Sequence, residues 1–215
     1  MSLDHTLLDD STSDTNIKQF NYPLSFEFKI GTFSNDFTVK ESSGATVAYV
    51  RQKMFKFKEA IQVYSNEQRV KEVYTINADR IIDFNASYSF KNEDEETLGK
   101  VGRKGMRSLW KASYDIFDND NNILFHIKEE NPWAKVFDSL LGEVPIISLF
   151  TGYLFNPKYI VTKPDDTVPL LRLSKSPSFF GRIFKLEKLG DISHHESEQI
   201  ILSLMMMSLL ERRRG

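Results

Sequence analysis

The chain contains no cysteine. Without a thiol it can form no disulfide bond, and it can use neither a thiolate nucleophile nor a thiolate metal ligand. This composition is compatible with a reducing compartment, so we expect a cytoplasmic protein. The expectation leaves peripheral association with a membrane open.

The chain also lacks a strong excess of either charge, because its formal net charge is only −2 over 215 residues. A chain this close to neutrality has no strong overall attraction to nucleic acid or to an anionic membrane, so only local patches can act. We therefore expect no nucleic-acid partner.

The N-terminal residues lack basic charge and any apolar run. Their acidic residues are Asp4, Asp9, Asp10 and Asp14. Such a segment is not a secretory signal, and its polar composition predicts a disordered or loosely attached acidic arm over residues 1–16. Because no linker or repeat divides the rest of the chain, we expect residues 17–215 to form a single domain.

Long apolar runs are absent except for residues 200–210, near the end of the chain. This run is shorter than the about 20 apolar residues that a membrane-spanning helix needs, so we expect no transmembrane span. Ser193 and Glu196 have the spacing of a capping box just before the run. Together with the arginines that follow the run, this pattern predicts a helix over residues 194–213.

The predicted helix is apolar on all sides, because its polar interruptions Ser203 and Ser208 fall on different sides. A helix with this composition must be enclosed by protein if lipid does not surround it. Enclosing a cylinder about 10–12 Å wide takes more strands than a small barrel has, since an eight-stranded barrel is already filled by its own side chains.

Short strands with turn signals between most of them account for much of the preceding chain. We predict strands at residues 24–30, 37–40, 46–53, 60–64, 70–77, 80–84, 87–91, 97–103, 109–117, 123–128, 158–162, 168–173 and 182–188. The predicted fold class is therefore mostly β: a closed antiparallel barrel of about twelve strands around a buried C-terminal helix.

Residues 131–157 break this pattern, since they are dense in large apolar side chains. We interpret them as a crossover that plugs one end of the barrel. The alternative is an exposed patch from Val144 to Phe155 for membrane docking or dimerisation, and the sequence leaves the oligomeric state open.

Several stretches together resemble a known family. They are residues 44–54 (Gly-Ala-Thr-Val-Ala-Tyr-Val-Arg-Gln-Lys-Met), 62–64, 73–76, 109–117, 123–128 and the run at 200–210. In these stretches the chain is similar to the LURP-one-related proteins, which belong with the tubby C-terminal domain and the phospholipid scramblases. The resemblance implies a tubby-like barrel of about twelve strands around a central helix. In that superfamily, tubby-like domains are associated with phosphoinositide headgroups and scramblases with calcium-dependent lipid movement.

Two basic stretches are candidates for binding an anionic headgroup. One interleaves lysines with Met54, Phe55 and Phe57, and the other combines positive charge with glycines that can direct backbone amides at a phosphate. The ordinary alternatives are a solvated strand face and glycines that permit a tight bend in the barrel. The candidate residues are Arg51, Lys53, Lys56, Lys58, Lys100, Arg103, Lys104 and Arg107.

Calcium-loop spacing is partly matched by Asp118, Asp120, Asn122 and Glu129. However, Ile123 stands where such a loop needs glycine, so we predict a plain turn and no metal site. His194 and Glu198 share a helix face, but two ligands make a weak site.

Motifs that would specify an enzyme are missing. The chain has no G-x-S-x-G, and the stretch from His195 to Gln199 fails the H-E-x-x-H pattern at its last position. We therefore expect no cofactor and a non-enzymatic binding module for anionic phospholipid or phosphoinositide headgroups at a membrane surface. The alternatives are a scramblase-like lipid-translocating protein, a protein-interaction or structural domain, and a hydrolase or transferase whose site carries no recognisable motif.

Overall fold

A computed structural model of the chain describes residues 20–29, 35–52, 60–82, 85–103, 113–130, 158–176 and 183–212. At residues 80–82, 85–86 and 212 it describes the backbone only. The predicted acidic arm and the predicted crossover at residues 131–157, with the patch from Val144 to Phe155, lie outside these ranges.

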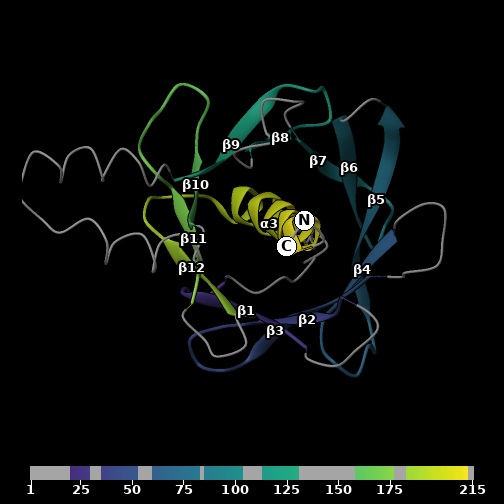
Figure 1. Cartoon of the computed structure of the whole chain (residues 1–215). Coiled ribbons are helices and arrows are strands. Elements are labelled where there is room, and N and C mark those ends of the chain that lie inside the picture. Colours follow the sequence, from purple (N-terminus) through teal and green to yellow (C-terminus); the bar gives the residue numbers. More distant parts are fainter. Residues whose placement is uncertain are drawn as a thin grey trace, which may run out of the picture.

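The described residues form a closed barrel of twelve antiparallel strands with one helix inside it (Figure 1). The strands are β1 (Leu24–Phe28), β2 (Phe37–Lys40), β3 (Thr46–Gln52), β4 (Ala60–Tyr64), β5 (Glu72–Ile82), β6 (Asn85–Asn92), β7 (Thr97–Arg103), β8 (Ser113–Phe117), β9 (Ile123–Glu129), β10 (Lys158–Thr162), β11 (Leu171–Lys175) and β12 (Ile183–Lys188). Each strand pairs with its neighbours in the sequence, and β1 pairs with β12 to close the ring. The predicted fold class is confirmed.

The strands of the barrel wall alternate apolar and polar residues. Successive side chains of a strand point to opposite faces, so the apolar ones face the interior and the polar ones face outward. In β1, Leu24, Phe26 and Phe28 are buried, while the residues between them are partly exposed. The Phe26 ring lies 5.8 Å from the ring of Phe37 on the paired strand β2. Strand alternation thus supplies the apolar lining of the barrel.

The prediction was wrong at β5, which is one strand where the sequence predicted two, at residues 70–77 and 80–84. The pairing of β5 with β6 shifts register between Ala78 and Arg80. The extra residue, Asp79, accepts hydrogen bonds from the hydroxyls of Ser87 and Ser89 on β6. A bulge interrupts the alternation without ending the strand, which explains why the pattern looked like two strands.

The helix α3 (His194–Arg212) is buried from Ile200 to Leu209. The predicted capping box is present: Ser193 N donates to Glu196 Oε2 at 2.8 Å, and Glu196 N donates to Ser193 Oγ at 3.2 Å. The bond that the Glu196 carboxylate accepts from Ser193 N lowers the pKa of this carboxyl. The central helix is therefore where the sequence predicted it.

Apolar packing alone does not set how deeply a helix sits in a tube, because the hydrophobic effect is non-directional. Polar contacts near both ends of α3 supply this direction. The Tyr74 hydroxyl of β5 donates to Glu198 near the start of the helix, and the Tyr114 hydroxyl of β8 donates to Glu211 near its end. Gln199 Nε2 adds a bond of 2.6 Å to the carbonyl oxygen of Leu98.

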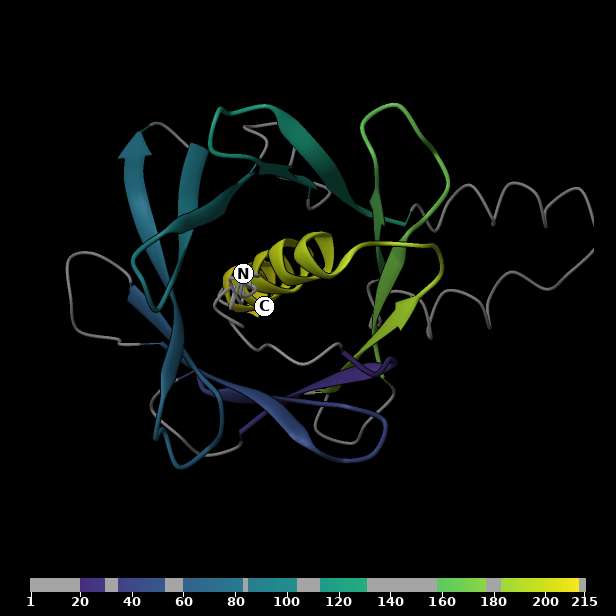
Figure 2. The same cartoon turned by 180° about the vertical axis from the view of Figure 1, so that it is seen from behind.

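The helix lies closer to one wall than to the other, and its backbone approaches β6, β7 and β8 most closely (Figure 2). Gly99 on β7 allows this approach. A Cβ at Gly99 would lie 2.7 Å from the carbonyl oxygen of Phe117 and 3.2 Å from Gln199 Nε2. Its φ of +150° is also one that residues with a side chain rarely adopt.

We expect Gly99→Ala to lower the free energy of unfolding by about 2–4 kcal/mol, because backbone strain and overpacking act together. Gly44→Ala is the matched control: Gly44 has a φ of +84° but open space around it, so only strain contributes. We expect the control to lose about 1–2 kcal/mol. Urea unfolding of both variants measures the difference, and equal losses would show that neither Phe117 nor Gln199 crowds this position.

Candidate functional site

Three of the eight predicted basic residues lie within the described ranges: Arg51, Lys100 and Arg103. Their positions are described relative to the two ends of the barrel. We call the end where α3 begins the N-rim, which carries the turns at 41–45, 65–71, 92–96, 118–122, 163–170 and 189–193. We call the end where α3 ends the C-rim, at which β1, β3, β5, β7, β9 and β11 finish.

Arg51 lies one residue before the end of β3, near the C-rim. Its neighbours Val50 and Gln52 are buried, whereas Arg51 is partly exposed, so its side chain faces outward.

Arg103 is the last residue of β7 at the same rim. It has the same position in the strand alternation as the buried Gly99 and Val101, so it is on the inward face of the strand. Burial and the neighbouring Glu211 raise the pKa of Tyr114, and the positive charge of Arg103 lowers it. Arg103 thus belongs to the polar group at the helix C-terminus.

Lys100 lies away from the other two. Its Nζ donates to Asn121 Oδ1 at 3.1 Å, and Asn121 belongs to an N-rim turn. The glycine-rich stretch that contains Lys100 is a paired strand as far as Arg103, so its described part forms barrel wall and no phosphate-binding turn. The remaining predicted residues, Lys53, Lys56, Lys58, Lys104 and Arg107, lie outside the described residues.

Asp118 acts as a turn residue, as predicted. Its carboxylate accepts bonds from the backbone of Asp120 and Asn122 and from the side chain of Asn122, at 2.8–2.9 Å. These bonds, the Asn122 side chain foremost, lower the pKa of Asp118. Within the described ranges, no group of three or more His, Asp or Glu side chains is placed to hold a metal ion.

The predicted pair of His194 and Glu198 is not joined by a hydrogen bond. The distance from Glu198 Oε2 to His195 Nδ1 is 3.7 Å, and the ring centroid of His194 lies 6.1 Å from that of Phe20. On the outer wall, His126 Nδ1 lies 2.6 Å from Asp115 Oδ1 across paired strands.

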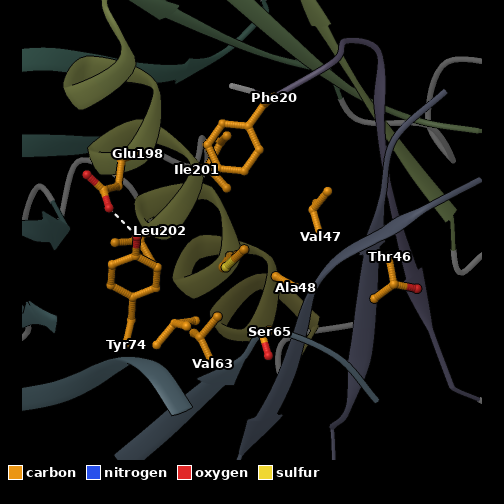
Figure 3. Close-up of a pocket in the computed structure, with 12 residues that line it drawn as sticks. Phe20, Thr46, Val47, Ala48, Val63, Ser65, Tyr74, Glu198, Ile201 and Leu202 are labelled. Atoms are coloured by element: carbon orange, nitrogen blue, oxygen red, sulfur yellow. Dashed lines mark hydrogen bonds between the residues drawn. The ribbon is translucent and has the colours of Figure 1, made fainter. Parts of the chain in front are cut away.

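A cavity that the sequence did not predict lies between α3 and the wall formed by β3, β4 and β5 (Figure 3). It has a volume of about 370 Å³. Its lining is mostly apolar and comes from Phe20, Thr46, Val47, Ala48, Val63, Ser65, Val73, Tyr74, Glu198, Ile201, Leu202 and Met205.

One polar pair borders this cavity. The Tyr74 hydroxyl from β5 meets the Glu198 carboxylate from α3, as Figure 3 shows. Burial and the neighbouring Glu198 raise the pKa of Tyr74 well above its ordinary value, so the phenol stays protonated and donates. Phe20 lies at the outer side of the cavity and also lines a second, more polar hollow of about 740 Å³ beside His194.

No signal in the sequence marked this cavity. Val47, Ala48 and Val63 read as ordinary core residues, and nothing in a strand pattern tells how far a central helix is displaced toward one wall. The close approach of α3 to β7 involves Gly99 and Gln199, which are 100 residues apart in the chain.

Comparison of the chain with family models, curated protein sequences and solved structures gave no match in any of the three. The resemblance to LURP-one-related proteins therefore stays a prediction that rests on the residues quoted for it. Among the described residues, no helix is both long enough and apolar enough to cross a bilayer.

Proposed function

We propose that this protein is a non-enzymatic binding module that docks its C-rim on anionic phospholipid headgroups at a membrane surface. The observation that supports the proposal most is the topology of the strands. β3 ends at Gln52 and β4 begins at Ala60, both at the C-rim, and β7 ends there at Arg103 before β8 begins at Ser113. The two basic stretches predicted separately thus leave from and return to one end of the barrel.

Residues 53–59 read Lys-Met-Phe-Lys-Phe-Lys-Glu, and residues 104–112 read Lys-Gly-Met-Arg-Ser-Leu-Trp-Lys-Ala. Lysine and arginine near an anionic bilayer contribute about 1 kcal/mol each, and aromatic side chains favour the interfacial region. The apolar stretch at 144–155 also belongs to a connection between strand ends at this rim, β9 to β10. Basic and apolar residues therefore occur together in the connections of the C-rim.

The N-rim has the opposite character. Its six turns carry the acidic residues Glu41, Glu67, Glu93, Asp94, Glu95, Glu96, Asp118, Asp120, Asp165, Asp166 and Asp191, against Arg69, Lys71 and Lys163. An anionic surface repels this end and attracts the other. Charge separation along the barrel axis would orient the protein with the C-rim toward the membrane.

Co-sedimentation with vesicles tests the proposal. We expect binding to vesicles that contain phosphatidylserine, little binding to pure phosphatidylcholine, and weaker binding as salt is raised. Reversing two charges in Lys56→Glu with Lys58→Glu should weaken the binding by about thirtyfold or more.

Lys71→Glu with Lys163→Glu is the matched control, because it changes the net charge equally but at two exposed N-rim positions. We expect this control to bind vesicles about as well as the unmodified protein. Binding that ignores salt, or that both double variants weaken equally, would contradict docking by the C-rim.

A further inference from the structure

We propose that the cavity beside α3 binds a small cationic amphiphile, an apolar chain that carries a protonated amine, with the amine on the carboxylate of Glu198. This site lies at the N-rim side of the barrel, so it is separate from the surface proposed to meet lipid headgroups. It does not depend on that proposal.

The cavity has the size and lining of a small-ligand site. Its volume of about 370 Å³ falls within the range of about 300–1,000 Å³ that such sites occupy. Val63, Ile201 and Met205 offer aliphatic and thioether surface to an apolar chain. Burying such a chain removes apolar surface from water, which favours binding.

Glu198 gives the site its charge preference. One carboxylate oxygen accepts the hydroxyl of Tyr74, and the other is 3.7 Å from His195 Nδ1, which is beyond hydrogen-bond range. Among the described residues, His195 is the one basic group within ion-pair distance of this carboxylate, and its own side chain is 62% exposed. The second oxygen therefore keeps its acceptor capacity for a cation.

Tyr74 fixes the geometry of this carboxylate. The phenol donates to one carboxylate oxygen, as Figure 3 shows, so the rotation of the Glu198 side chain is restricted. The other oxygen is left for a donor. A protonated amine supplies up to three charge-assisted donors, whereas a fatty acid would bring a second negative charge to the same place. The chemistry thus favours an amine over a carboxylic acid.

The charge of the N-rim favours the same class of ligand. Thr46, Ser65 and Val73 of the cavity lining lie at or next to the N-rim ends of β3, β4 and β5. The turns around them are the acidic ones, which raise the local concentration of cations. Electrostatic attraction by the N-rim and the charge of the Glu198 carboxylate both favour a cationic ligand.

Calorimetric titration of the full chain with n-octylamine, and separately with n-octanol, tests this site. We expect octylamine to bind more tightly than octanol, which has the same chain without the charge. Glu198→Gln keeps an oxygen that accepts from Tyr74, so it removes charge with little change of shape. We expect this variant to bind octylamine about tenfold to a hundredfold more weakly and octanol with unchanged affinity.

Ala48→Leu is the second variant, because Ala48 lines the cavity and a larger side chain there occupies open volume. We expect it to weaken both ligands while the protein still unfolds cooperatively in urea. Octylamine that binds Glu198→Gln as tightly as the unmodified protein would overturn the proposal. Undiminished octylamine binding by Ala48→Leu, or no octylamine binding at all, would overturn it as well.

Discussion

Leu204→Asp is expected to abolish the folded barrel under conditions in which the unmodified protein is stable. Leu204 is fully buried in the middle of α3, with the barrel wall around it. The substitution removes a large apolar side chain and brings in a carboxylate that has no partner there. Truncating a buried leucine to alanine alone costs about 2–5 kcal/mol, and a buried unpaired charge adds several more. The total is comparable with the about 5–15 kcal/mol that stabilises a typical domain.

Two controls make this prediction specific to enclosure of the helix. His195→Asp introduces the same carboxylate at a position that is 62% exposed in the first turn of α3, where the helix dipole favours negative charge. We expect it to change the free energy of unfolding by less than about 0.5 kcal/mol. Leu204→Met keeps the apolar volume and should cost less than about 1.5 kcal/mol. Circular dichroism and urea unfolding compare the three variants, and a folded Leu204→Asp protein would contradict an enclosed helix.

Steep unfolding at alkaline pH is the second large effect that we expect. Tyr74, Tyr114 and Tyr159 each have a pKa raised above the ordinary value of 10.0, first by burial and then by neighbouring carboxylates. Below about pH 10 these phenols are protonated in both the folded and the unfolded chain, so their contribution to stability is constant. Above that pH the unfolded chain loses the protons and the folded protein retains them.

The sign follows from proton counting. Because the unfolded state binds fewer protons than the folded state above about pH 10, stability falls as pH rises, by about 1.4 kcal/mol per pH unit for each tyrosine. Three tyrosines acting together approach about 4 kcal/mol per pH unit near pH 11 and give about half of that at pH 10. Urea unfolding at several values between about pH 9 and pH 11 measures this slope.

Tyr74→Phe should make the alkaline slope shallower, because one titrating group is removed. The same variant should lose about 1–3 kcal/mol at neutral pH, since Glu198 is left without its donor. A stability that stays flat across the alkaline range would show that these tyrosines are not held protonated inside the barrel. Ultraviolet absorbance of tyrosinate in the folded protein provides an independent reading of the same ionisation.

Most of the fold prediction came from the apolar run at residues 200–210. An apolar run with polar caps on both sides is a local signal, and a helix that is apolar all round requires enclosure. The short alternating strands then left a barrel as the structure able to enclose it. β2, β4, β7 and β10 have the predicted bounds, because alternation and turn residues are also local signals.

What the sequence did not predict depends on contacts between distant residues. The bulge at Asp79 is stabilised by Ser87 and Ser89 on the next strand, and the close approach of α3 to β7 depends on Gly99 meeting Gln199. The positions of the basic residues in the barrel also depend on the fold and not on the local sequence. Lys100 and Arg103 are close in sequence, yet one binds an N-rim turn and the other faces the helix C-terminus, which only strand direction and pleat determine.

Nuclear Overhauser effects from labelled methionine methyl groups test the enclosed helix most directly. Met205, Met206 and Met207 follow one another on α3 and are buried, so their methyl groups point to different sides of the helix. We predict contacts from this trio to inward methyl groups on different sides of the barrel, including Val63 of β4 and Val101 of β7, within one molecule. Contacts to one wall only, or contacts that arise between differently labelled molecules in a mixed sample, would contradict a helix enclosed by its own barrel.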